Sequence, residues 1–103
     1  MYNNVSDWDR MVSGKLYNSS SKDIEKQHMR GLTLCDKFNR IPVWQAKRKQ
    51  RTLEKLIPSA KENGLAIFAP FYCEYGVNIK VGKECFVNYN SVFLDISPII
   101  LGN

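Results

Sequence analysis

A six-residue rhythm of apolar residues runs through the last third of the chain. Medium or large apolar side chains recur at Ala69, Tyr75, Val81, Val87 and Phe93. Each is followed four positions later by a mostly small residue, at Cys73, Ile79, Cys85, Ser91 and Ser97. This pattern is typical of a parallel β-helix, in which triangular coils stack and bury columns of like side chains. We therefore expect the large residues of the repeat from Tyr75 onward to stack in one interior column.

The repeat continues into the last residues of the sequence. Ile99, Ile100 and Leu101 resemble the start of another coil, and the sequence ends at Asn103. Coils bury their apolar faces only against neighbouring coils. We therefore expect an incomplete, truncated β-helix with an exposed, unpaired edge near residues 99–101.

The first two thirds of the chain have the residue spacing of helices. A short helix is predicted over residues 7–12. Ser19, Ser20 and Ser21 offer N-caps for a second helix, and Ser20 with Asp23 approximates a capping box. The buried stripe of this second helix is expected at Ile24, His28, Leu32, Cys35 and Phe38. Pro42 and Pro58 bound a third helix, predicted over residues 43–57.

The Asn63-Gly64 turn signal separates the helices from residues of β type, which begin at Leu65. We expect residues 1–62 to form an α-helical cap and residues 63–103 to begin the β-helix. The predicted fold class is mainly β, with an α-helical N-terminal cap.

The three cysteines, Cys35, Cys73 and Cys85, form an odd set without metal-ligand spacing. We interpret them as reduced thiols in the core. His28 could join them around a zinc ion, but a single histidine without a Cys-x-x-Cys pair favours no metal site. Because His28 lies on an apolar stripe, we favour a core or capping role over a catalytic one.

The sequence contains no uncharged apolar run long enough to cross a bilayer. Residues 1–4 lack the basic start of a signal peptide, and no apolar segment of that kind follows them. We therefore expect a cytoplasmic protein without a membrane partner.

Positive charge gathers in the helical part of the chain. Residues 1–66 hold 13 Lys/Arg against 7 Asp/Glu, whereas residues 67–103 hold 2 against 3. The densest stretch, residues 47–51, could bind nucleic acid by neutralising phosphates. We favour a solvated helix face instead, because no aromatic residues are interleaved with these cations.

An ordered set of motifs carries a family resemblance. In chain order the motifs are Gly14-Lys15-Leu16-Tyr17, Arg30-Gly31, Phe38-Asn39, Pro70 through Ile79, Val81-Gly82, Val87-Asn88 and Phe93-Leu94-Asp95. Together they resemble the N-terminal part of the sugar O-acetyltransferases of the hexapeptide-repeat family, with maltose and galactoside acetyltransferases as near kin. The resemblance extends from about Asp7 to Asn103.

The resemblance implies a left-handed parallel β-helix that transfers acetyl from acetyl-CoA to a sugar hydroxyl of the maltose, glucose or galactoside type. It also implies a homotrimer with active sites between subunits. The family uses a histidine as general base, which suits a side chain of near-neutral pKa. That histidine lies in a Thr-x-His-Pro-like motif beyond Asn103, as does the main coenzyme-binding region. We therefore expect no catalytic residue within these 103 residues, and no activity from them alone.

The resemblance further implies one wall of an acceptor pocket. Asn88 matches a family asparagine that can hold a sugar hydroxyl, although asparagines at this coil position can also stack as ladders. Asp95 matches a family aspartate, with an acceptor-side and a scaffold role both open. Ser19 and Glu74 occupy acceptor-contacting positions and favour the maltose branch, and Phe86 is a candidate apolar floor.

Two functions of different classes follow. The first is a sugar O-acetyltransferase represented by its N-terminal part. The second is a non-catalytic remnant that acts as a binding or oligomerising module.

Overall fold

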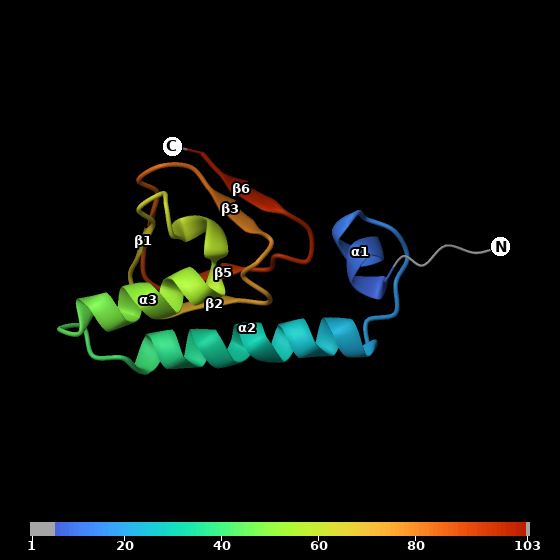
Figure 1. Cartoon of the computed structure of the whole chain (residues 1–103), viewed down its shortest axis with the longest axis horizontal. Coiled ribbons are helices and arrows are strands. Elements are labelled where there is room, and N and C mark those ends of the chain that lie inside the picture. Colours follow the sequence, from blue (N-terminus) through green and yellow to red (C-terminus); the bar gives the residue numbers. More distant parts are fainter. Residues whose placement is uncertain (1–5, 103) are drawn as a thin grey trace.

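The computed structural model describes residues 6–102, so the expectations drawn from residues 1–4 and from Asn103 lie outside it. The helices are α1 (Asp7–Val12), α2 (Lys22–Arg40), α3 (Ala46–Leu56) and the 3-10 helix η1 (Pro58–Ala60). The strands are β1 (Ala66–Ile67), β2 (Phe71–Cys73), β3 (Ile79–Val81), β4 (Phe86–Val87), β5 (Ser91–Phe93) and β6 (Ile99–Leu101). In Figure 1, α2 and α3 run along one side of the coiled strands, and α1 stands at the N-terminal end of α2.

The predicted helix over residues 7–12 is confirmed as α1, whose Ser6 cap accepts the Asp9 N–H at 3.0 Å. Ser21, one of the three serines expected as N-caps, is the N-cap residue of α2, so the capping box predicted with Ser20 is wrong. The Asp23 carboxylate accepts the Ser21 hydroxyl and, at 3.0 Å, the N–H of Trp8. Asp23 therefore ties α1 to the start of α2.

The third helix is shorter than predicted, because the chain makes a turn after Pro42 before α3 begins. The Gln45 N–H donates to the Pro42 carbonyl at 2.9 Å and closes this turn. Leu53 and Leu56 form the packing face of α3 and are fully buried.

The buried stripe of α2 differs from the predicted one at two positions, namely His28, which is only partly buried, and Leu32. Ile24, Cys35 and Phe38 are buried as expected, but Leu32 is 45% exposed. Gly31 takes its place on the buried face. A Cβ at Gly31 would lie 2.3 Å from the carbonyl oxygen of Glu74, so glycine allows α2 to approach the strand region closely.

The strands form two stacked coils joined by parallel pairing. Strand β1 pairs with β4, β2 with β5, and β3 with β6, and every pair of partners is 20 residues apart. Three regular six-residue repeats would place partners about 18 residues apart. The difference arises because the strands do not start at even intervals, with β3 beginning eight residues after β2.

The single interior column predicted from the repeat is therefore wrong. The paired interior positions are Ile67 with Val87, Cys73 with Phe93, and Val81 with Leu101. Tyr75 lies outside the coil interior, in a separate cluster with Met11 and Ile24. The repeat marks inward-facing positions correctly at Val81 and Val87, but these side chains lie on different faces of the triangle.

Polar side chains of the helical cap complete the free edge of the first coil. The Asn39 side chain donates to the Phe71 carbonyl at 3.0 Å and accepts the Phe71 N–H at 2.8 Å. The Ser59 hydroxyl bonds in the same way to the Ile79 carbonyl and the Val81 N–H. An edge strand left unpaired would be open to aggregation, so these two residues protect β2 and β3.

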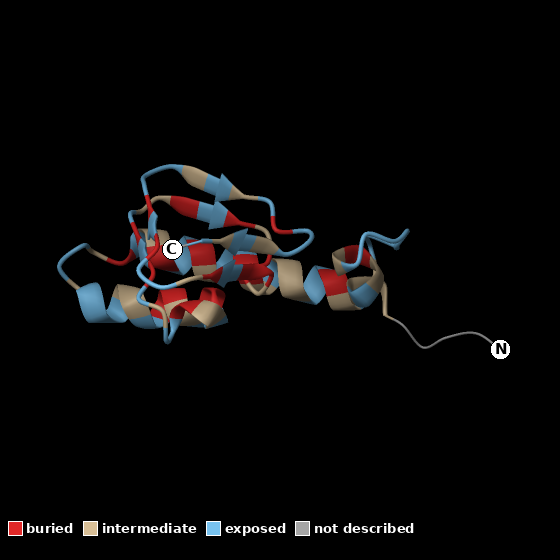
Figure 2. Ribbon diagram, turned by 90° about the horizontal axis from the view of Figure 1, so that it is seen from above, coloured by how far each residue is buried: buried red, intermediate tan, exposed pale blue. Residues whose placement is uncertain are grey.

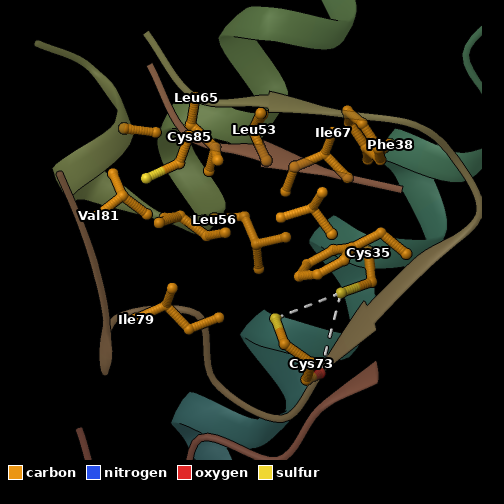
Figure 3. Close-up of a cluster of buried hydrophobic side chains, with 14 residues drawn as sticks. Cys35, Phe38, Leu53, Leu56, Leu65, Ile67, Cys73, Ile79, Val81 and Cys85 are labelled. Carbon is orange, nitrogen blue, oxygen red and sulfur yellow. Dashed lines mark hydrogen bonds between the residues drawn. The ribbon is translucent and has the colours of Figure 1, made fainter. Parts of the chain in front are cut away.

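The main core lies between the helices and the coils (Figures 2 and 3). Leu56, Ile57, Phe71 and Ile79 are completely buried there. Figure 3 shows Cys35 of α2 and Cys73 of β2 pointing toward each other, with their sulfur atoms 3.7 Å apart. All three cysteines are buried and unbridged, as the interpretation of core thiols expects. Within residues 6–102, no helix is long and apolar enough to cross a membrane.

Candidate functional site

Asp95, which lies between β5 and β6, is completely buried and binds the backbone of the turn between β2 and β3. Its Oδ1 accepts the N–H of Glu74 at 3.1 Å and that of Tyr75 at 2.9 Å. Its Oδ2 accepts the N–H of Gly76 at 2.7 Å and that of Asn78 at 3.3 Å. Both oxygens are thus occupied by backbone donors. These contacts are those expected of the scaffold role, and the acceptor-side role of Asp95 stays a prediction.

The turn that Asp95 binds is also held from two other sides. Asn78 returns a side-chain hydrogen bond to the Asp95 carbonyl at 2.7 Å. Gly76 has a φ of 85°, and a Cβ there would lie 2.2 Å from the Leu56 carbonyl oxygen. Only glycine fits this conformation and this spacing. The backbone of Glu74 is therefore fixed at the end of β2.

Ser19 and Glu74 lie together in a depression of about 260 Å³ between α2 and this turn. Its lining residues are Tyr17, Ser19, Ile24, Glu25, His28, Glu74, Tyr75 and Ile96. The His28 and Tyr75 rings are 5.6 Å apart at a tilted angle. Burial, and then the nearby Glu74 carboxylate, raise the pKa of the Tyr75 hydroxyl, which keeps it protonated as a hydrogen-bond donor.

This depression combines carboxylates and hydroxyls with aromatic rings. Carboxylates accept hydrogen bonds from hydroxyl groups, and serine and tyrosine hydroxyls both donate and accept. Such a lining can bind a polyol. The sequence did not single out Tyr17, Glu25 or His28 as members of the site. For Tyr17 the available signal was its place in the Gly14–Tyr17 motif, and for His28 it was the polar side chain on an apolar stripe.

Asn88 and Phe86 lie elsewhere, at a second depression of about 490 Å³ bounded by β4, β5 and β6. Interior side chains of the second coil, Val87 and Leu101 among them, also line it. The Asn88 Oδ1 accepts the N–H of Tyr89 at 2.8 Å. Phe86 is 57% exposed, with its ring 5.0 Å from that of Phe68.

The five predicted site residues therefore fall into three places. Ser19 and Glu74 share one depression, Asn88 and Phe86 share another, and Asp95 is buried beneath the backbone of Glu74. The two depressions have no lining residue in common. Among residues 6–102, no three histidine, cysteine or acidic side chains are grouped to hold a metal ion.

Comparison with known proteins agrees with this arrangement of helices and coils. The family described as the maltose acetyltransferase hexapeptide capping motif matches residues 10–61, about half of the chain. A putative acetyltransferase of Staphylococcus haemolyticus is 35% identical over 92 residues, which are 88% of this chain and 47% of the relative.

Two solved structures share the fold. The maltose O-acetyltransferase of Clostridium difficile superposes with a TM-score of 0.90 at 28% identity, over 98% of this chain and 54% of that one. A hexapeptide-repeat acetyltransferase of Vibrio cholerae, solved with acetyl coenzyme A, gives a TM-score of 0.77 at 25% identity, over 95% and 52%. The chain therefore has the fold of the capped part of hexapeptide-repeat acetyltransferases.

The chain belongs to the maltose acetyltransferase hexapeptide capping family. The resemblance inferred from the sequence motifs is thereby confirmed. The chain spans about half the length of the relatives that it matches.

Proposed function

We propose that the chain is the N-terminal part of an acetyl-CoA-dependent O-acetyltransferase acting on a sugar hydroxyl of the maltose, glucose or galactoside type. The observation that carries this proposal is the depression shared by Ser19 and Glu74, with its hydroxyl, carboxylate and aromatic lining. A few convergent polar groups beside apolar rings are what a small polar ligand requires. The likeness to a maltose O-acetyltransferase and to an acetyl-CoA-bound enzyme supports the acceptor and the acetyl donor.

In the proposed reaction, an oxygen of the sugar attacks the carbonyl carbon of the thioester. The new C–O bond forms, the C–S bond breaks, and the proton of the sugar hydroxyl passes through a general base to the leaving thiolate of coenzyme A. His28 is the one histidine of the sequence, and it lies in the cap beside Tyr75. We assign it to shaping the acceptor depression, with the base and the main coenzyme region supplied by sequence beyond Asn103.

A homotrimer of left-handed β-helices with active sites between subunits is part of the same proposal. The depression at Ser19 and Glu74 and the one at Asn88 and Phe86 lie apart on one chain. An active site between two subunits would bring one depression from each copy to the same acceptor. This arrangement explains why residues of one predicted pocket are separated in a single protomer.

The acceptor half of the proposal can be tested by titrating maltose into the isotopically labelled chain and following amide NMR shifts. We expect shifts at Ser19 and Glu74, and at least a severalfold weaker response in Glu74→Ala. Glu62→Ala is the matched control, because Glu62 is an exposed glutamate outside the depression. Equal responses in the two variants, or no shift at millimolar maltose, would contradict the proposed acceptor site.

The donor half can be tested by turnover. We expect no acetyl-CoA-dependent acetylation of maltose, glucose or galactosides by residues 1–103 alone, because loss of a general base alone removes on the order of 10²–10⁴-fold in rate. Turnover by the purified chain that Asn88→Ala abolishes would contradict this assignment of the base.

One observation favours the oligomerising module as a second candidate. Strand β6 pairs only with β3 among the described residues, and Ile100 on it is 78% exposed. An apolar edge strand of this kind can add a strand from another copy. We expect residues 1–103 to self-associate in light scattering and Ile100→Lys to reduce the association. A monodisperse monomer at high concentration would count against this candidate.

A further inference from the structure

The turn between α2 and α3 carries two strongly exposed apolar side chains. Val43 and Trp44 are each 80% exposed. The turn lies at the opposite end of the molecule from the N-terminus (Figure 1). Val43 also borders a depression of about 430 Å³ that Phe68 and Tyr89 line. An exposed tryptophan within a wider apolar area is typical of an interaction surface.

Unpaired positive charge adjoins this turn. Lys47, Arg51 and Lys55 are exposed and follow one another at intervals of four residues, so they lie along one face of α3. Within residues 6–102 the ion pairs are Arg10 with Asp7 and Arg40 with Asp36. None of the three α3 cations is therefore neutralised by a salt bridge in the described part of the chain.

The tryptophan and the cations form one surface. Trp44, Lys47, Arg48 and Arg51 line the same depression of about 600 Å³. No aromatic residue lies among the cations in the sequence, because Trp44 precedes the basic stretch instead of alternating with it. The turn after Pro42 brings its ring beside the first turn of α3.

We propose that this surface, the α3 basic face (Val43, Trp44, Lys47, Arg48, Arg51 and Lys55), docks on an anionic lipid bilayer. Tryptophan prefers the membrane–water interface, where Val43 and its apolar surroundings reach the acyl boundary. The cations beside them are attracted to anionic headgroups, and each cation raises the affinity of the chain for the bilayer roughly fivefold. The expectation of no membrane partner rested on the lack of a spanning segment, and docking on the surface needs none.

The observations favour a bilayer over a nucleic-acid strand. Single-stranded nucleic acid binds through several aromatic rings along a charged groove. Trp44 is the one ring that lines the basic depression in the described chain. Val43 is as exposed as Trp44. An aliphatic side chain cannot stack on a nucleic-acid base, but it can insert between lipids.

The test is co-sedimentation of the full 103-residue chain with vesicles of phosphatidylcholine alone or with about one third phosphatidylserine. We expect binding only to the anionic vesicles, weakened by high salt because the attraction is screened. Neutralising the face with Lys47→Gln, Arg51→Gln and Lys55→Gln should weaken binding at least about tenfold. Trp44→Ala should weaken it severalfold without changing the circular dichroism spectrum.

The matched control is the triple variant Lys22→Gln, Lys26→Gln and Lys37→Gln, which removes the same charge from exposed positions on α2. It should bind the anionic vesicles nearly as well as the unmodified chain. Equal losses in the two triple variants would overturn the proposal, because net charge alone would then explain binding. Binding to a fluorescent oligouridylate without binding to vesicles would also overturn it, in favour of nucleic acid.

Discussion

The carboxylate of Asp95 accepts a hydrogen bond of 2.7 Å from the backbone N–H of Gly76, across the boundary between the two coils. Three more backbone donors of the same turn point at this carboxylate, which is shielded from solvent. Several amide donors replace the hydration that the carboxylate lost on burial. Asp95 thus holds the backbone of Glu74, whose side chain lines the candidate acceptor depression.

Replacing Asp95 should be among the most damaging changes in the chain. Asp95→Ala would leave buried N–H groups without acceptors, each of which costs about 1–3 kcal/mol. We expect the free energy of unfolding to fall by at least about 3 kcal/mol, measured by denaturant titration. Asp36→Asn, at an exposed pair with Arg40, should change it by less than about 1 kcal/mol. Similar losses in both variants would show that the turn is held by other contacts.

Gly31→Ala should destabilise the protein even though alanine is the better helix former. In a solvated helix the change would gain about 1 kcal/mol. Here the new Cβ would lie 2.3 Å from the Glu74 carbonyl oxygen, so α2 must move away from the turn. Thr33→Ala, at an exposed position of the same helix, is the control and should be neutral or stabilising. A more stable Gly31→Ala variant would mean that α2 does not pack this closely.

Strand β3 allows a direct test of which side chains face the coil interior. Val81 is buried beside Leu101, and its neighbour Lys80 is exposed on the other face. Val81→Asp would bury an unpaired carboxylate and should cost about 3 kcal/mol or more. Lys80→Asp introduces the same side chain one residue away and should cost about 0.5 kcal/mol or less. Thermal or denaturant midpoints decide the matter, and a larger loss at Lys80 would invert the assigned strand faces.

The link between α1 and α2 should weaken in acid. The Ser21 hydroxyl, and then the N–H of Trp8, lower the pKa of Asp23. A carboxyl group whose pKa is depressed by folding stabilises the folded state above its unfolded pKa of about 4, and loses this contribution as pH falls through the folded value. We therefore expect denaturant midpoints between neutral and acidic pH to fall more steeply for the unmodified chain than for Asp23→Asn.

Asp36→Asn provides the charge-matched comparison for this experiment, since it removes one carboxylate from α2 without touching the link to Trp8. Parallel pH profiles for the unmodified chain and Asp23→Asn would show that the link between the helices contributes nothing to acid sensitivity.

Much of the fold was predictable because it depends on local pattern. Residues 7–12 form a helix as their spacing indicates, and Pro58 ends the third helix because proline lacks the N–H that a helix needs. The alternation of the repeat placed Val81 and Val87 correctly in the interior. The family followed from an ordered set of motifs that no single repeat could have identified.

The sequence could not place the predicted site residues relative to one another. Ser19 and Glu74 are 55 positions apart in the sequence, and only the docking of the cap on the β2–β3 turn brings them into one depression. The burial of Asp95 could not be predicted from residue type, since an exposed and a buried carboxylate look alike in a sequence. It depends on the backbone donors that the folded chain places around the side chain.

The sequence by itself determined the inward positions Val81 and Val87 and the bounds of α1, because these follow from side-chain periodicity and from backbone stereochemistry. Only the tertiary structure decided the register between coils, which the eight-residue step from β2 to β3 shifts from the regular repeat. It also decided that Gly31 must be small and that Asn39 must satisfy the edge of β2. Contacts of this kind join segments distant in sequence, and their energies depend on packing distances that no local pattern encodes.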